Sequence, residues 1–140
     1  MNKQDKELLL KYLCCILPYG VKVRCDFGLD GEITEISRTK NNLYYCKYLD
    51  CKEGYCYIES LKPYLFPLSS MSEEQKEELM NICGERIGFN SGTFIDFNGY
   101  GEVPIECVND VIDWLNANHF DYRGLIEKGL AIDCTNLNIY

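Results

Sequence analysis

Several cysteines stand at spacings from which a metal site could be built. Cys46, Cys51 and Cys56 are each separated from the next by four residues, and Cys25 could supply a fourth thiolate. Structural zinc sites usually present cysteine pairs with such short separations. Cys46 and Cys56, however, lie in strand-like runs, where cysteine behaves as a small apolar side chain. We therefore expect no metal ion, no other cofactor and no native disulfide in the reduced protein.

The single histidine, His119, is the other residue around which catalysis could be built. Asp121 and Arg123 follow it, and a Cys–His–Asp arrangement would provide an activated thiol nucleophile. The surroundings of the available cysteines match no nucleophile signature, so we assign no catalytic residue and expect a histidine favoured by a helix end. A small enzyme that uses His119 with Asp121, Arg123 or a cysteine stays an alternative. The cysteines in question are Cys83, Cys107 and Cys134.

A segment rich in glycine and aromatic residues covers residues 86–101. Glycine-rich loops that cradle phosphate are followed by a Lys-Ser or Lys-Thr pair and lie between a strand and a helix. This segment lacks that pair, so its composition favours a hairpin or an ordered loop over a phosphate site. Its Phe94 and Phe97 are candidate binding residues.

Tyrosines are concentrated in residues 43–61, which hold five of the 11 in the chain. Strand alternation places Tyr44 and Tyr48 on one face of a sheet and Tyr45 on the other, although a small sheet usually packs only one face on the core. Either helices and the core edge take up these rings, or one face is exposed and binds a partner. We expect Tyr45 and Tyr57 to differ in burial from Tyr44 and Tyr48. The candidate binding residues are Tyr44, Tyr45, Tyr48, Tyr55 and Tyr57.

The charge balance restricts the class of partner. A formal net charge of −8 and the lack of a basic cluster disfavour sequence-independent binding to DNA or RNA, which needs Lys and Arg to displace counterions. The acidity serves either solubility or imitation of a nucleic acid. We see no secretory signal and no run of about 20 apolar residues, so we expect no membrane association. Nine cysteines in such a chain favour reduced thiols in the cytoplasm.

The elements that must position these residues follow from the hydrophobic periodicity. Residues 6–17 carry apolar side chains at helical spacing, and Pro18 and Gly20 should end that helix. From residue 21 to 65 the period changes to two, with turns at residues 28–31, 41–42 and 50–54. The spacing of three between Ile33 and Ile36 breaks the alternation and indicates a β-bulge. This region predicts four short strands that curl into a small open barrel.

Helical signals return in the second half of the chain. Ser72 and Gln75 form a capping-box pattern, which predicts a helix with Leu79 and Ile82 on its apolar side. A further helix is predicted from the spacing of Val108, Val111, Ile112 and Leu115. After it, residues 130–134 are predicted to form a final strand.

The length of the chain and the order of these elements define the expected fold. A chain of 140 residues is near the commonest domain size and buries enough surface for a core without metal or disulfide links. We predict one globular domain over residues 1–140, of the α+β class. It should contain an N-terminal helix, a small antiparallel barrel-like sheet of four to five strands, and C-terminal helices.

Three blocks of the sequence resemble a known group of proteins. They read LLL at residues 8–10 with LPYGVKV at 17–23, LKPYLFPLSSM at 61–71, and DWLN, HFDYRGLI and GLAID at 113–116, 119–126 and 129–133. These blocks are similar to small uncharacterised proteins encoded by phages and prophages of Bacteroides-type gut bacteria. The resemblance implies an accessory protein made inside an anaerobic host. It implies no activity, so no catalytic residue is carried over.

This setting, together with the absence of a catalytic signature, favours a non-catalytic module that binds a host or phage macromolecule. A protein partner is expected, in the cytoplasm of the bacterial host. Besides the small enzyme already described, a structural component of a phage particle or assembly is an alternative.

Overall fold

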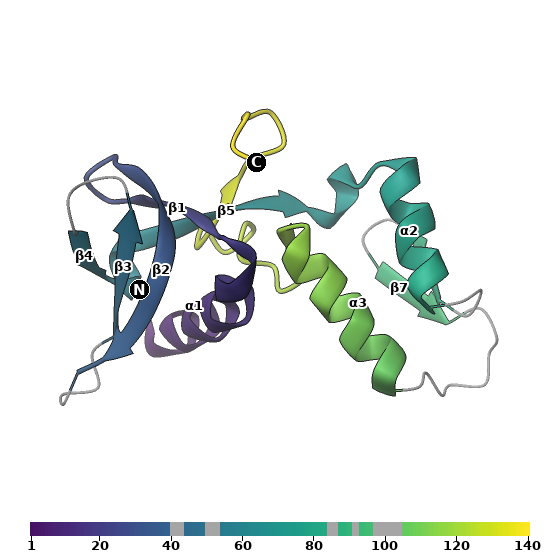
Figure 1. Cartoon of the computed structure of the whole chain (residues 1–140), viewed down its shortest axis with the longest axis horizontal. Coiled ribbons are helices and arrows are strands. Elements are labelled where there is room, and N and C mark those ends of the chain that lie inside the picture. Colours follow the sequence, from purple (N-terminus) through teal and green to yellow (C-terminus); the bar gives the residue numbers. More distant parts are fainter. Residues whose placement is uncertain (40–43, 50–53, 84–86, 91–92, 97–104) are drawn as a thin grey trace. The chain divides into compact units, whose positions relative to one another are not determined.

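The computed structural model describes residues 1–39, 44–49, 54–83, 87–90, 93–96 and 105–140 (Figure 1). Two compact units make up the chain: Met1–Leu65 with Arg123–Tyr140 form the first, and Phe66–Tyr122 form the second. Each unit has its own helices, strands and buried side chains. A single domain over residues 1–140 stays a prediction.

The first unit begins with helix α1 (Lys3–Ile16). Asn2 caps its start, because the Asn2 side-chain oxygen accepts a hydrogen bond from the Asp5 backbone N–H at 2.8 Å. The helix therefore begins earlier than residue 6, where the apolar spacing places it. At the other end, a 3-10 turn (Leu17–Tyr19) leads to Gly20, whose φ of 73° ends the helix as predicted.

One face of α1 supplies much of the core of this unit. Leu9, Leu13 and Ile16 lie at helical spacing and are fully buried, as the periodicity predicts. The next row around the helix is half-buried at Leu10 and exposed at Cys14. The buried face is thus narrower than the sequence pattern indicates.

An open, mixed sheet belongs to the same unit. Its path runs β4-β3-β2-β1-β5 with antiparallel neighbours, and β9 (Ile132–Asp133) pairs with β5 in parallel. The α+β class is confirmed, but the sheet does not close into a barrel, and its parallel partner of β5 comes from the distant C-terminal segment. The five antiparallel strands are β1 (Lys22–Cys25), β2 (Asp30–Arg38), β3 (Tyr44–Leu49), β4 (Gly54–Tyr57) and β5 (Leu61–Pro67).

The bulge predicted in β2 is present. β2 pairs with β3 in regular register from Arg38 back to Glu35, and the register shifts between Glu35 and Ile33. The extra residue restores the alternation of faces beyond it. Ile33 is therefore buried and Ile36 half-buried, although three positions separate them.

β5 is the strand that the sequence pattern missed. The alternation predicts four strands between residues 21 and 65, whereas the chain forms five from Lys22 onward, with a 3-10 turn (Ile58–Ser60) between β4 and β5. Pro63 pairs with Val23 at the last step of the β1–β5 ladder, and the β5–β9 ladder begins one residue later, at Tyr64. The proline thus stands where one ladder ends and the next begins, which is where a missing N–H disrupts pairing least.

Helix α2 (Glu73–Cys83) lies in the second unit and begins with the predicted capping box. The Ser72 N–H donates to the Gln75 side-chain oxygen at 2.9 Å, and the Gln75 N–H donates to the Ser72 hydroxyl at 3.2 Å. Glu73 and Glu74 occupy the first turn, where the helix dipole favours negative charge.

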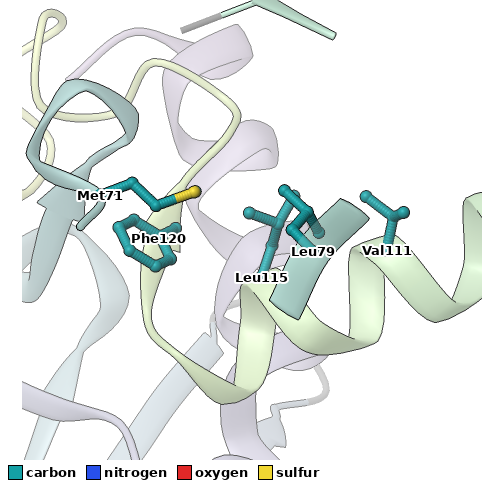
Figure 2. Close-up of a cluster of buried hydrophobic side chains, with 5 residues drawn as sticks. All are labelled: Met71, Leu79, Val111, Leu115 and Phe120. Carbon is teal, nitrogen blue, oxygen red and sulfur yellow. The ribbon is translucent and has the colours of Figure 1, made fainter. Parts of the chain in front are cut away.

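Helix α3 (Ile105–Ala117) follows the predicted spacing and packs in the core of the second unit. Val111 and Leu115 are buried, whereas Val108, the first position of the pattern, is exposed. The side chains shown in Figure 2 form the buried cluster of this unit: Met71, Leu79, Val111, Leu115 and Phe120.

Two strand pairings complete the second unit. β6 (Ile87–Asn90) and β7 (Thr93–Asp96) pair antiparallel, so residues 86–101 contain the hairpin that was one of the two predictions for this segment. β8 (Phe120–Asp121) pairs in parallel with the end of β5, with Phe66 opposite Phe120. Within the described ranges, no helix is both long enough and apolar enough to cross a membrane.

Candidate binding surface

Two tyrosines stand exposed on the last strand of the sheet. β4 pairs with β3, and in the described part of the chain it pairs with no other strand. Tyr55 is 58% exposed and Tyr57 is 52% exposed. They are two positions apart on one strand, so both rings lie on the same face, and the intervening Cys56 is half-buried. Tyr55 and Tyr57 together form the β4 tyrosine patch.

A surface cavity of about 340 Å³ adjoins this patch. Its described lining consists of both tyrosines, Cys56 and Thr39. Interfaces are enriched in tyrosine, and their strongest contacts are side chains that fill such hollows. The patch and its hollow therefore have the features of a surface that receives a partner's side chains.

The other predicted binding residues lie on neighbouring strands or outside the described residues. The register places Tyr45 opposite Tyr57. The predicted difference in burial involves side chains of β3 that are not among those described, so it stays a prediction. The predicted binding residues whose side chains are not described are Tyr44, Tyr45 and Tyr48 of β3, Phe94 of β7, and Phe97, which lies outside the described residues.

Cys56 and Cys25, two of the cysteines considered as metal ligands, lie near each other. Burial, and then the neighbouring Cys25 and Asp26, raise the pKa of the Cys56 thiol to about 11. Such a thiol stays protonated at neutral pH, whereas metal binding needs the thiolate. Among the described residues, no three His, Cys, Asp or Glu side chains form a group that could hold a metal. Cys46 lies opposite Cys56 on β3, and Cys51 is outside the described residues, so the absence of metal stays a prediction.

His119 lies just beyond the end of α3 in a packed, left-handed position. Its φ is 58°, the one positive value for a non-glycine residue in the described chain. The residue is 8% exposed, and Asp121 is 7% exposed. The His119 carbonyl accepts a hydrogen bond from the Phe66 N–H at 3.0 Å, which joins it to the β5–β8 pairing. The three described hollows are lined by residues other than His119 and Asp121.

The other residues proposed for a small enzyme are the three cysteines and Arg123, and the structure places them in different surroundings. Burial, and then Asp133, raise the pKa of the Cys134 thiol to about 11, which disfavours a nucleophilic thiolate. The Cys107 thiol donates to the Ile82 carbonyl, with 3.8 Å between Sγ and oxygen. Arg123 belongs to the first unit, whereas His119 belongs to the second. The Cys83 side chain is not among those described.

A polar network that the sequence does not suggest joins β1, β2 and β5. The Asp30 carboxylate accepts from Arg24 Nε at 2.8 Å, from Arg24 Nη2 at 3.0 Å and from the Tyr64 hydroxyl at 2.6 Å. Tyr64 is fully buried, whereas the Arg24–Asp30 pair is half-exposed. An exposed ion pair contributes about 1 kcal/mol or less, but a buried hydroxyl needs its acceptor. We therefore assign this network to stability.

Alkaline pH should destabilise the protein through Tyr64. Burial, and then the hydrogen bond to Asp30, raise the pKa of Tyr64 from 10 to about 12. The folded protein holds this proton more tightly than the unfolded chain does. Its contribution to the free energy of unfolding is therefore complete below pH 10 and lost as the pH rises from 10 to about 12. Tyr64→Phe should flatten this loss, measured by urea denaturation at a series of pH values.

A second variant separates the charge of Asp30 from the buried ring. Asp30→Asn keeps the Tyr64 hydroxyl but removes the charged acceptor, so the pKa of Tyr64 in the folded protein should fall. The alkaline loss of stability should still begin near pH 10, but it should be smaller and end at lower pH than in the wild type. Equal slopes of stability against pH for the wild type and Tyr64→Phe, between pH 10 and 12, would contradict the role assigned to Tyr64.

Phe27 is an exposed aromatic residue that sequence reasoning missed. The pattern places a turn at residues 28–31, but Asp30 and Gly31 already belong to β2, and the Gly28 N–H donates to the Cys25 carbonyl at 2.9 Å. Phe27 is thus at the tip of the β1–β2 connection and is 84% exposed. Its only sequence signal is an aromatic residue before a turn glycine. Single exposed apolar side chains are common on protein surfaces, so Phe27 alone defines no site.

Comparison with known proteins finds no family model that matches the chain, and no curated protein or solved structure with significant similarity to it. A functional proposal therefore depends on the surfaces of this molecule and on the resemblance of its sequence blocks.

Proposed function

We propose that this chain is a phage-type accessory protein of the bacterial cytoplasm that acts without catalysis, by binding a basic protein partner at the β4 tyrosine patch. The resemblance of its sequence blocks to proteins of phages and prophages supports the setting. The observation that carries the binding role is the pair of exposed rings, Tyr55 and Tyr57, beside a hollow on the last strand of the sheet.

Tyrosine suits this role because of its shape and its stiffness. The ring offers a large contact area and loses little conformational entropy, since only two side-chain torsions become fixed on binding. A tyrosine also carries a hydroxyl that can form a hydrogen bond with a polar group of a partner. Two such rings on one face give a contact area that a single exposed residue such as Phe27 does not give.

The charge of the chain favours a basic partner. The net charge of −8 attracts positive surfaces at long range and speeds their encounter with the protein. At short range, a Lys or Arg side chain binds favourably over the face of an exposed tyrosine ring. Both effects favour a protein segment that carries lysine or arginine.

Affinity capture from bacterial lysate tests this proposal. Three baits are compared: the wild type, Tyr55→Ala/Tyr57→Ala, and the control Phe27→Ala. The proposal expects a basic protein that the wild type and the control retain and the double variant loses. Equal retention by all three baits would place the interaction elsewhere. Recovery of acidic proteins alone would contradict the charge argument.

The enzyme alternative is tested at His119. His119→Asn should leave partner binding within about twofold of the wild type, since a buried histidine outside the patch contributes no contact. Asparagine accepts the left-handed φ of 58°, so His119→Asn should be more stable than His119→Ala by roughly 1 kcal/mol. Thermal unfolding and a binding titration measure the two effects. A folded His119→Asn protein without cellular activity would instead favour an enzyme that uses His119 with Asp121, Arg123 or a cysteine.

A further inference from the structure

Another surface pocket of the first unit is lined by positively charged side chains, although the protein as a whole is negatively charged. This α1–β2 pocket lies between α1 and β2 and has a volume of about 510 Å³. Three of its lining side chains are basic: Lys11 of α1, Arg38 of β2, and Arg123. Its described lining contains no aspartate or glutamate, although the chain has 22 acidic residues against 14 basic ones. Basic side chains from three separate segments thus line one pocket of an acidic protein.

The rest of the described lining is apolar. Leu10 and Ile36 contribute aliphatic side chains, and Cys14 and Cys15 contribute thiols. The Cys14 residue is exposed, but partial desolvation of its thiol, and then the neighbouring Cys15, raise the pKa of Cys14. This thiol therefore stays protonated and behaves as a small apolar group. The volume lies within the range of small-molecule sites, about 300–1,000 Å³. The pocket therefore offers both positive charge and apolar surface to a ligand of that size.

Arg123 is held against α1. Its Nη2 lies 4.0 Å from the Sγ of Cys15, and Gly124, with a φ of 70°, turns the chain directly after it. Arg123 is half-buried, which shields its charge from water more than that of an exposed base. A guanidinium group matches carboxylate and phosphate oxygens with two parallel hydrogen bonds. Glu7 of α1 and Glu35 of β2 stand on the same elements but do not line the pocket.

We propose that the α1–β2 pocket binds a small organic anion, a carboxylate or phosphate ester with an apolar body. Lys11, Arg38 and Arg123 neutralise the anionic oxygens, and Leu10 and Ile36 contact the apolar body. The pocket shares no described lining residue with the cavity beside the β4 tyrosine patch, although its Arg38 precedes Thr39, which lines that cavity.

Isothermal titration calorimetry of the full chain tests the ligand class. Octanoate and octyl phosphate serve as the two probes, and both should bind; the tighter one identifies the preferred anionic group. Inorganic phosphate has the charge without the apolar body, and it should bind at least about tenfold more weakly. Octyltrimethylammonium has the apolar body with the opposite charge, and it should not bind. A wild-type protein that binds neither octyl anion, or that binds the cation equally well, would overturn the proposal.

Substitution of the bases assigns the site. Lys11→Gln/Arg38→Gln/Arg123→Gln should weaken octanoate binding by at least about tenfold. A charge-matched control, Lys3→Gln/Lys62→Gln/Lys128→Gln, removes three exposed lysines outside the pocket and should change binding by less than about twofold. If the pocket variant does not fold, the single change Lys11→Glu at an exposed position should still weaken octanoate by about fivefold. Equal losses in the two triple variants, or no loss from Lys11→Glu, would overturn the assignment.

Discussion

Replacing both Tyr55 and Tyr57 by alanine should weaken binding of the basic partner by at least about thirtyfold, which is about 2 kcal/mol. Both rings are more than half exposed, so their removal should change the free energy of unfolding by less than about 1 kcal/mol. Binding would be measured by calorimetry with the purified partner, and stability by urea denaturation. A large loss of affinity with little loss of stability is the expected signature of a contact surface.

Two controls accompany this double variant. Tyr55→Phe/Tyr57→Phe retains both rings, so its affinity should stay within about fivefold of the wild type if ring contacts dominate. Phe27→Ala removes a more exposed aromatic side chain from the β1–β2 connection and should leave affinity unchanged. A double alanine variant that binds as tightly as the wild type would exclude the patch.

Phe120→Ala should have the largest effect on stability, a loss of about 3–5 kcal/mol in the free energy of unfolding. Phe120 is 1% exposed. Its ring stacks on Trp114 with centroids 5.7 Å apart, and it meets Phe66 at 6.1 Å. It also lies in the buried cluster shown in Figure 2. Removal of the ring leaves a cavity and separates the remaining members of that cluster.

Urea denaturation followed by circular dichroism would measure this loss. Val108→Ala removes an exposed apolar side chain from α3 and should cost less than about 1 kcal/mol. Folded domains are typically stable by only about 5–15 kcal/mol, so Phe120→Ala is expected to be close to unfolding at 37 °C. Similar midpoints for Phe120→Ala and Val108→Ala would show that the cluster does not stabilise the fold as described.

Local signals in the sequence predicted the elements whose cause is local. The capping box at Ser72 and Gln75, the bulge between Ile33 and Ile36, and the end of α1 at Gly20 are each confirmed. Each depends on a side chain or a backbone preference within a few residues. These features can therefore be predicted without knowledge of how distant segments pack.

Features that depend on distant parts of the chain were not predicted. β5 is a strand despite its two prolines because segments far away in the sequence, β1 and β9, pair along it. Such pairings override the local preference of proline, and neither is visible in residues 61–67 alone.

The candidate sites divide in the same way. The concentration of tyrosines in residues 43–61 marked Tyr55 and Tyr57 as candidate binding residues, and both are exposed. The convergence of Lys11, Arg38 and Arg123 on one pocket has no signal in the sequence, because these bases are far apart along the chain. Only the packing of α1, β2 and the segment after residue 122 brings them together.

Photo-crosslinking from β4 tests directly whether the tyrosine patch contacts a basic protein partner. A benzophenone amino acid is placed at position 57, where the side chain is exposed, and in a separate protein at position 27. After irradiation with the captured partner, mass spectrometry identifies the joined peptides. We expect a crosslink from position 57 to a lysine- or arginine-rich segment of the partner, and none from position 27. Crosslinks from position 27 alone, or none from position 57 while the complex still forms, would contradict it.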